Sequence, residues 1–271
     1  MASQPMRDLL EARLEDAMRR CAVGSIAYLA FLTMPDRRRA ERILDAHGMR
    51  GAYWFWGGYS TAERACLFLL PDYLVAMLPE DADERVGVLL DYLAEEIADA
   101  VVALSIKGSG FRKLTHRDYL GAVLGLGIER DAIGDIAVQG DHEAILFCPR
   151  TLAVFLMTEL TKVGSDTVHC RACLIDDSFT DGKQYRPISD TVASARLDCV
   201  VAALCNLSRE HAQEAIRGGV VEVDFEPQER VDILLEPPVT LSIRGYGRFI
   251  LRSFDGETKK GRLRLKADQL I

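Results

Sequence analysis

The feature that most constrains the fold is a run of apolar segments between residues 101 and 175 that alternates between strand-like and helix-like patterns. In chain order these segments predict a strand at 101–109, a helix at 115–127, strands at 133–141 and 143–149, a helix at 150–164 and a strand at 167–175. The order β-α-β-β-α-β is typical of a four-stranded antiparallel sheet with helices on one face, the ferredoxin-like or RRM-like fold. We therefore predict an α+β protein with an RRM-like (ferredoxin-like βαββαβ) middle domain at residues 84–178.

The segments on either side of this domain are less regular. Residues 1–83 predict an N-terminal α/β domain with helices at 6–21 and 37–47 and strand-like runs at 52–56 and 65–74. Ser60 and Glu63 have the spacing of a capping box, so we expect a helix or a turn to begin after the glycine pair that precedes them. Residues 179–193 mix Asp, Ser, Gly and Pro without apolar periodicity, which predicts a linker.

Residues 194–271 predict a separate C-terminal module of two short helices followed by strands. Apolar side chains recur at i, i+3, i+4 and i+7 from Leu197, which marks one face of a helix. Ser208 is a suitable N-cap for a second helix. Strands are expected at 239–243, 248–254 and 262–266, and Asp255-Gly256 predicts the turn between the last two.

Positive charge is concentrated in residues 242–266. This stretch holds eight Lys or Arg against two acidic residues, a balance of +6, whereas the whole chain carries a net charge of −8. In a strand at 262–266, Arg262, Arg264 and Lys266 share one face and the leucines the other. Such a face suits a phosphate backbone, because guanidinium groups bond phosphate oxygens and release counterions. The same pattern also fits a solvated edge strand protected by charge, and both interpretations stay open.

A second basic cluster lies in the glycine-containing loop before the helix expected at 115–127. Thr115 and Asp118 have capping-box spacing there, and a basic loop beside a helix N-terminus can hold a phosphate. The G-x-x-x-x-G-K-[ST] pattern of a P-loop is absent from the sequence. The alternative is structural, with His116 and Asp118 simply fixing the start of the helix. The residues of this second candidate contact with a nucleic acid are Lys107, Arg112, Lys113, His116 and Arg117.

The cysteines do not predict a metal site. Seven of them are scattered along the chain, mostly among apolar neighbours, which is typical of free thiols in a reducing compartment. Cys170 and Cys173 fall in an expected strand, where residues i and i+3 point to opposite faces and cannot converge on one zinc ion. We expect no metal and no cofactor. The sequence shows no signal-peptide core and no stretch of about 18 apolar residues, so we expect a cytoplasmic protein without membrane contact.

Longer motifs carry a resemblance to known families. The run "RLDCVVAALCNLSREHAQEAIRGGVVEV" resembles the S4 RNA-binding domain, in the following marks: Arg196-Leu197-Asp198, Ser208-Arg209, Ala212, Ile216 and Gly219-Val220. "SIRGYGRF" followed by "TKKGRLRL", downstream of "IKGSGFRKLTHRDYLGAVLGLGIERDAIGDI", is similar to the YlmH-like family, also described as photosystem II S4-domain proteins. "WGGYSTAERA" fits the first section of that family, so the resemblance covers nearly the whole chain.

The resemblance implies an S4 domain at 194–271 and an RNA-binding protein without an enzymatic step. It implies that the RNA is rRNA, tRNA or both, on the large ribosomal subunit, in the rescue of stalled nascent chains known as ribosome-associated quality control. We expect a monomer. The RNA-facing residues that the resemblance implies are Arg196, Ser208, Arg209, Arg217, Arg244, Arg248, Lys259, Lys260 and Arg262.

Two other functions remain open at this point. Residues 195–198, "ARLD", are similar to the G-R-L-D loop that carries the catalytic Asp of pseudouridine synthases, although the same triplet is part of the S4 resemblance. An RNA-modifying enzyme is therefore one alternative. Outside residues 242–266 the charge balance is −14, which suits a cell-division or other protein-interaction factor as well as mere solubility.

Overall fold

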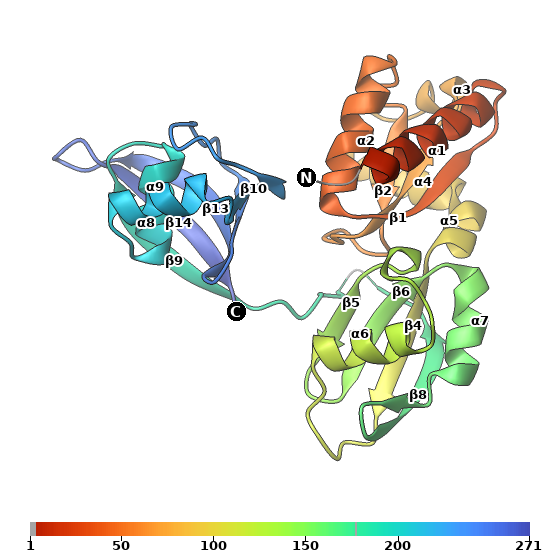
Figure 1. Cartoon of the computed structure of the whole chain (residues 1–271). Coiled ribbons are helices and arrows are strands. Elements are labelled where there is room, and N and C mark those ends of the chain that lie inside the picture. The colour runs from red at the N-terminus through yellow and green to blue at the C-terminus, as the bar shows by residue number, and fades with distance from the viewer. Residues whose placement is uncertain (1–3, 177) are drawn as a thin grey trace. The chain divides into compact units, whose positions relative to one another are not determined.

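The computed structural model describes residues 4–176 and 178–271 and shows a mixed α+β protein (Figure 1). The chain forms two compact units, one that ends at Gly182 and one that runs from Lys183 to Ile271. The predicted sections 1–83 and 84–178 both fall within the first unit. Among the described residues no helix is both long enough and apolar enough to cross a membrane.

The N-terminal section of the first unit is a three-stranded antiparallel sheet with helices. Its elements are α1 (Gln4–Ala22), β1 (Ala27–Leu32), α2 (Met34–Ala46), β2 (Tyr53–Trp56), β3 (Ala65–Leu69) and α3 (Asp72–Val75), with strand order β1-β3-β2. The helices predicted at 6–21 and 37–47 and the strand at 52–56 are confirmed. The second helix begins earlier than predicted, because the side chain of Thr33 accepts a hydrogen bond from the Asp36 N–H at 3.3 Å. Leu14 and Leu44 of the two helices share one buried core with Leu67 of β3.

The loop between β2 and β3 is a turn that a carboxylate from the middle section holds in place. The backbone N–H of Glu63 donates to Asp135 Oδ2 at 2.7 Å, and Tyr59 Oη donates to the same oxygen at 2.8 Å. The capping box predicted between Ser60 and Glu63 is therefore wrong, because Asp135 accepts the N–H that Ser60 was expected to accept. A sequence pattern of four residues cannot exclude such a competitor from a distant part of the chain.

Two helices that the sequence analysis did not anticipate lead into the middle section. They are α4 (Ala82–Tyr92) and α5 (Ala94–Ala100). Asp81 caps α4 by accepting hydrogen bonds from two backbone N–H groups at 3.0 Å. Leu89 of α4 and Leu93 after it are fully buried in the core that also contains Phe68 of β3 and Phe147 of the middle section. The N-terminal and middle sections are therefore packed on one shared core.

The middle section has the predicted β-α-β-β-α-β order. The elements are β4 (Val102–Gly108), α6 (His116–Gly125), a 3-10 turn η1 (Arg130–Ala132), β5 (Ile136–Gln139), β6 (Glu143–Cys148), α7 (Arg150–Glu159), β7 (Lys162–Val163) and β8 (Asp166–Cys173). The sheet has five strands in the order β5-β6-β4-β8-β7, one more than predicted. The difference arises because α7 ends at Glu159 and the following residues pair with β8 instead of continuing the helix.

Helices α6 and α7 cover one face of this sheet, and the N-terminal section packs on the other. Leu104 of β4 is buried with Tyr119 of α6, whereas Phe147 of β6 belongs to the core shared with the N-terminal section. Cys170 packs against the first core and Cys173 against the second. The prediction that these two thiols point to opposite faces is confirmed.

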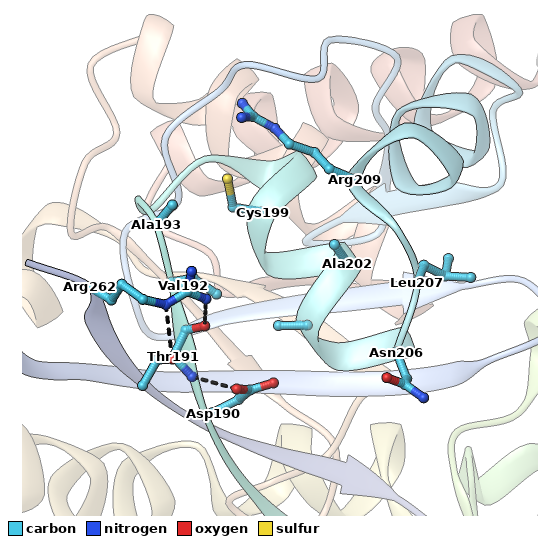
Figure 2. A pocket seen from close by; sticks show the side chains of 11 residues that line it. Asp190, Thr191, Val192, Ala193, Cys199, Ala202, Asn206, Leu207, Arg209 and Arg262 are labelled. Carbon is cyan, nitrogen blue, oxygen red and sulfur yellow. Dashed lines mark hydrogen bonds between the residues drawn. The ribbon is translucent and has the colours of Figure 1, made fainter. Parts of the chain in front are cut away.

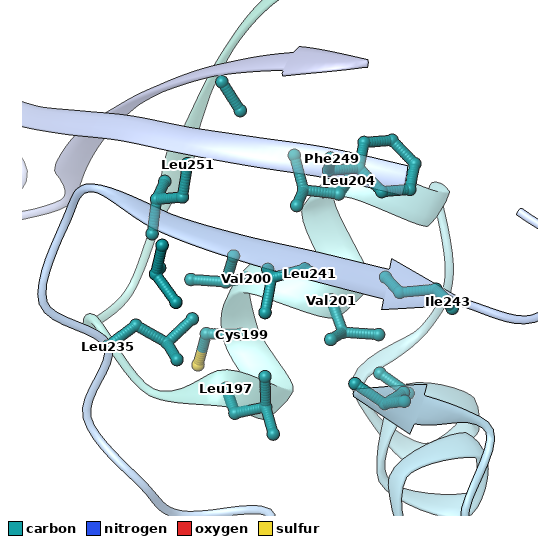
Figure 3. Close-up of a cluster of buried hydrophobic side chains, with 14 of the residues drawn as sticks. Leu197, Cys199, Val200, Val201, Leu204, Leu235, Leu241, Ile243, Phe249 and Leu251 are labelled. Atoms are coloured by element: carbon teal, nitrogen blue, oxygen red, sulfur yellow. The ribbon is translucent and has the colours of Figure 1, made fainter. Parts of the chain in front are cut away.

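The C-terminal unit is a six-stranded antiparallel sheet with a helical hairpin on one face (Figure 1). Its elements are β9 (Tyr185–Val192), α8 (Leu197–Cys205), α9 (Arg209–Arg217), β10 (Val221–Val223), β11 (Glu226–Pro227), β12 (Val239–Ile243), β13 (Gly247–Glu257) and β14 (Leu263–Leu270). The strand order is β11-β10-β12-β13-β14-β9. Figure 3 shows the predicted helical face of α8 packing on the sheet, where Leu197, Val201 and Leu204 belong to one buried cluster with Leu241 and Phe249.

Two predictions about this unit are wrong. Most of the predicted linker 179–193 is strand β9, which pairs with β14 along its whole length. A strand at the sheet edge buries little, so only Ile188 and Val192 turn toward the core and the sequence looks polar. The Asp255-Gly256 pair is not the turn but part of β13, at an irregularity of its pairing with β14. The chain reverses instead at residues 258–262, where the Gly261 N–H donates to the Thr258 carbonyl at 2.9 Å.

Candidate nucleic-acid interface

A buried carboxylate organises the start of the α8–α9 hairpin. Asp198, in the first turn of α8, is fully buried. Arg196, the residue before the helix, donates to Oδ1 at 3.0 Å and to Oδ2 at 3.2 Å. From α9, Arg209 donates to Oδ2 at 3.0 Å and Gln213 donates to the same oxygen at 2.7 Å. The side chains of Arg196 and Arg209 are 33% and 56% exposed, so the carboxylate fixes two solvent-facing guanidinium groups close together.

The surroundings of Asp198 keep it ionised. Burial by itself would raise its pKa, but hydrogen bonds from Arg196, Gln213 and Arg209, with the charge of Arg209, outweigh burial and hold the pKa well below its ordinary value. The ionised form is therefore the one that the folded hairpin stabilises.

We expect the C-terminal unit to lose stability in acid because of this group. The pKa of Asp198 is lower in the folded chain than the value of about 3.9 expected when unfolded. The stabilisation is therefore fully present above pH 4 and is lost as the pH falls toward the folded pKa. The stability of the C-terminal unit is measured by denaturant unfolding of the whole chain at pH values between 7 and 3, with hydrogen exchange at α8 as the probe. The difference in stability between wild type and Asp198→Asn should shrink below pH 4, and a constant difference would contradict the expectation.

A hollow of about 330 Å³ opens beside Arg209 (Figure 2). Its walls come from the end of β9, from α8 and from Arg262, which precedes β14. Arg262 is fixed in place, because its Nε donates to Thr191 Oγ1 at 3.1 Å and its Nη2 donates to the carbonyl of the same residue. Asn206, which ends α8 in a left-handed conformation with φ of 53°, lines the hollow as well. The fold thus brings Arg209 and Arg262 to one surface although they are far apart in the chain.

A second hollow, also of about 330 Å³, lies at the turn between β12 and β13. Arg244 and Arg248 line it, with Gly245 and Gly247 between them. These glycines have φ of +88° and +110°, a conformation that residues with a Cβ rarely adopt. The Arg248 guanidinium lies 5.1 Å from the centroid of the Phe225 ring, a cation–π contact that orients it.

The remaining predicted RNA-facing residues do not line these hollows. Lys259 and Lys260 are exposed in the turn at 258–262, and Arg217 is exposed in the last turn of α9. Ser208 caps α9 by accepting the His211 N–H at 3.2 Å, as predicted, so its hydroxyl is engaged in the fold.

Part of the basic face predicted for 262–266 is neutralised by neighbouring acids. Lys266 pairs with Asp255 at 2.6 Å, and Arg252 pairs with Asp268 at 2.8 Å. Arg264 is exposed on the same face as Lys266, and Leu265 is buried, which confirms the predicted alternation. The cations that remain available to a phosphate lie mainly at the hairpin and at the turns.

The basic loop of the middle section is built largely as the capping interpretation predicts. Thr115 and Asp118 form a complete capping box at the start of α6. Arg112 pairs with that same carboxylate at 2.9 Å, and Lys113 pairs with Asp141 at 2.9 Å. The other three residues of the predicted contact are exposed: Lys107, His116 and Arg117. Arg112 and Lys113 are therefore held by carboxylates.

The sequence analysis missed two residues that hold the predicted cations. Gln213 lies one helical turn after Arg209 and bonds the same carboxylate, a spacing of i, i+4 that the sequence does contain. Thr191 fixes Arg262 from β9, and no local signal could have revealed it, because the two residues meet only through the sheet. In the described part of the chain, no group of three or more His, Cys, Asp or Glu is arranged to hold a metal ion.

Comparisons with known proteins give three likenesses. Residues 100–177 match the family described as a putative RNA-binding domain in YlmH. The chain is 31% identical over 211 residues to the ribosome-associated protein quality control protein P2 of Bacillus subtilis (strain 168), covering 78% of this chain and 75% of that relative. The cell division protein ylmH from Streptococcus pneumoniae is 22% identical, with a TM-score of 0.44 over 63% of this chain and 90% of that structure.

Proposed function

Because the chain belongs to the YlmH-like family of proteins, we propose that it binds structured RNA of the ribosome and catalyses no reaction. The observation that carries the proposal is the pair of arginines held on one buried carboxylate, Arg196 and Arg209 on Asp198. Their guanidinium groups are oriented before any ligand arrives, so binding loses less conformational freedom than it would with mobile lysines. Arg262, which lines the same hollow as Arg209, is also oriented before a ligand binds, in this case by its hydrogen bonds to Thr191.

The grouping of these cations on one surface suits the backbone of a folded RNA. Guanidinium groups donate paired hydrogen bonds to phosphate oxygens, and several cations fixed on one rigid surface select a defined arrangement of phosphates. Lys259 and Lys260 extend the positive surface as mobile point charges. Phosphate contacts then dominate the affinity, and sequence is read little or not at all.

The finer assignment follows the resemblance in the sequence. In our proposal the C-terminal unit is an S4 domain, the middle section is RRM-like, and the bound RNA is rRNA, tRNA or both on the large ribosomal subunit. The relative from Bacillus subtilis is named for ribosome-associated protein quality control, which supports a role in the rescue of stalled nascent chains. We further propose that the protein works as a monomer in the cytoplasm.

The proposal predicts that loss of three cations releases the protein from ribosomes. A variant with Lys259→Ala, Lys260→Ala and Arg262→Ala should bind large-subunit RNA at least about tenfold more weakly than wild type, since each lost phosphate contact also removes counterion release. The measurements are crosslinking with sequencing of bound RNA in cells and sedimentation through a sucrose gradient. We expect wild type to enrich large-subunit rRNA or tRNA and to sediment with 50S particles, and the variant to stay at the top of the gradient.

A matched control distinguishes the loss of the binding site from the loss of net positive charge. Arg13, Arg19 and Arg50 are exposed cations of the first unit, and their replacement by alanine removes the same charge elsewhere. This control should sediment like wild type. If wild type neither sediments with ribosomal particles nor enriches any RNA, the proposal is wrong and the protein-interaction or cell-division alternative takes its place.

A further inference from the structure

The loop between β4 and α6 displays an aromatic ring that no packing contact accounts for. Phe111 is 90% exposed, the highest value of any aromatic side chain among the described residues. Single exposed apolar residues are common on protein surfaces, so exposure alone carries no conclusion. The surroundings of the ring, however, combine a fixed backbone with a concentration of positive charge.

The backbone on both sides of Phe111 is held in place. Before it, Ser109 Oγ donates to the buried carboxylate of Asp166 and accepts the Phe111 N–H at 3.3 Å. After it, the carbonyl oxygen of Arg112 lies 2.9 Å from Nδ1 of His142, within hydrogen-bond distance. The ring is thus presented to solvent by an ordered loop and is not exposed through fraying of the chain.

The loop around the ring is basic. Residues 107–118 contain four Lys or Arg against one Asp. Lys107 and Arg117 are exposed. Lys113 is 72% exposed, and its ion pair with Asp141 lies at the surface, where such pairs contribute little to stability. Lys113 can therefore exchange this carboxylate for a phosphate at small cost.

Among the described strands of the middle section, Phe147 of β6 is the one Phe, Tyr or Trp, and it is not accessible on the face where an RRM stacks bases. Phe147 of β6 is fully buried, with Tyr59 at 5.1 Å and Phe179 at 5.9 Å between ring centroids. These aromatic contacts are internal to the first unit. An RNA contact of the RRM type through Phe147 is therefore blocked, whereas Phe111 is 90% exposed.

We propose that Phe111 is a stacking platform for an unpaired base of bound RNA, with Lys107, Lys113 and Arg117 bonding the flanking phosphates. An aromatic ring among cations matches the two parts of a nucleotide, the flat base and the charged phosphate. The proposal rests on the RNA-binding function proposed above and adds a contact that selects single-stranded segments, because bases in a duplex already stack on one another. The match of residues 100–177 to a putative RNA-binding domain favours RNA over an acidic protein segment as the occupant.

The test compares ring variants of the full chain. Fluorescence anisotropy is measured with a short labelled single-stranded RNA and with the same strand paired to its complement. Phe111→Ala should weaken binding of the single strand about tenfold and change binding of the duplex little, whereas Phe111→Trp should keep the affinity of wild type. Phe155→Ala, which removes an exposed ring from α7 of the same section, is the matched control and should bind like wild type.

The outcomes separate this contact from the function on which it rests. If wild type binds RNA and Phe111→Ala binds the single strand equally well, the stacking contact is wrong while RNA binding stands. If wild type binds neither RNA, the failure is that of the proposed function. If Phe111→Ala keeps RNA affinity but loses a ribosomal protein that wild type retains, the ring docks a protein and the inference is overturned. Unchanged thermal unfolding of the variants excludes misfolding as the cause of any loss.

Discussion

Replacing Asp198 with alanine is expected to lower the free energy of unfolding of the C-terminal unit by about 3 kcal/mol. The substitution removes the acceptor of four hydrogen bonds and leaves Arg196, Arg209 and Gln213 without their shared partner. Breaking a buried ion pair from one side typically costs about 3–5 kcal/mol, because the remaining charge is desolvated without compensation. We expect the lower end, since the Arg209 side chain is 56% exposed and can regain water.

Denaturant unfolding of the full chain with hydrogen exchange resolved to α8 and α9 measures this cost. The matched control is Asp255→Ala, which breaks an exposed pair with Lys266 at 2.6 Å and should cost less than about 1 kcal/mol. RNA affinity should fall with Asp198→Ala even under conditions where the unit remains folded, because Arg196 and Arg209 are no longer oriented. Equal stability of the two variants would show that the buried carboxylate does not organise the hairpin.

The second large effect is expected at Gly58, whose replacement by alanine should destabilise the first unit by about 3 kcal/mol. A Cβ at this position would lie 2.4 Å from the ring of Phe147, which is fully buried. The ring cannot move aside, because Tyr59 and Phe179 pack against it. In addition, the φ of +100° at Gly58 is unfavourable for any residue with a side chain.

Gly48→Ala distinguishes the cost of the steric clash from the cost of the positive φ. Gly48 also has a positive φ, +77°, but a Cβ there would meet no atom within 4 Å. Its replacement should cost about 1 kcal/mol, the backbone contribution alone. Thermal or denaturant unfolding of both variants gives the comparison. If the two variants are equally stable, the fit of Gly58 against Phe147 does not limit the packing of the N-terminal section on the middle section.

The elements with local signals could be predicted from the sequence. The apolar face that begins at Leu197 and the cap at Ser208 lie within single helices, and the capping box of Thr115 and Asp118 spans four residues. In each case the residues that define the element also lie next to one another in the chain. The order of strands and helices in the middle section could be predicted for the same reason, because the apolar residues of each strand or helix repeat with the period of that element.

The elements without such signals could not be predicted. Strand β9 lies at the edge of the sheet and contains Pro187, which an edge strand tolerates, so its sequence resembles a linker. The candidate interface shows the same limit. The composition and the resemblance predicted which cations belong to the interface. No local sequence pattern indicates that Arg209 and Arg262 share a hollow or that Thr191 orients Arg262.

The pairing of β9 with β14 has a consequence for how such a module can be combined with others. Tyr185 lies opposite Leu270, and the Ile271 N–H donates to the Gln184 carbonyl at 3.0 Å, so residues 184–185 and 270–271 of the C-terminal unit lie side by side. A unit whose two end segments are adjacent can be inserted into a loop of another protein, or circularly permuted, without displacing any strand. The pairing of β9 with β14 therefore makes the C-terminal unit suitable for domain insertion and circular permutation.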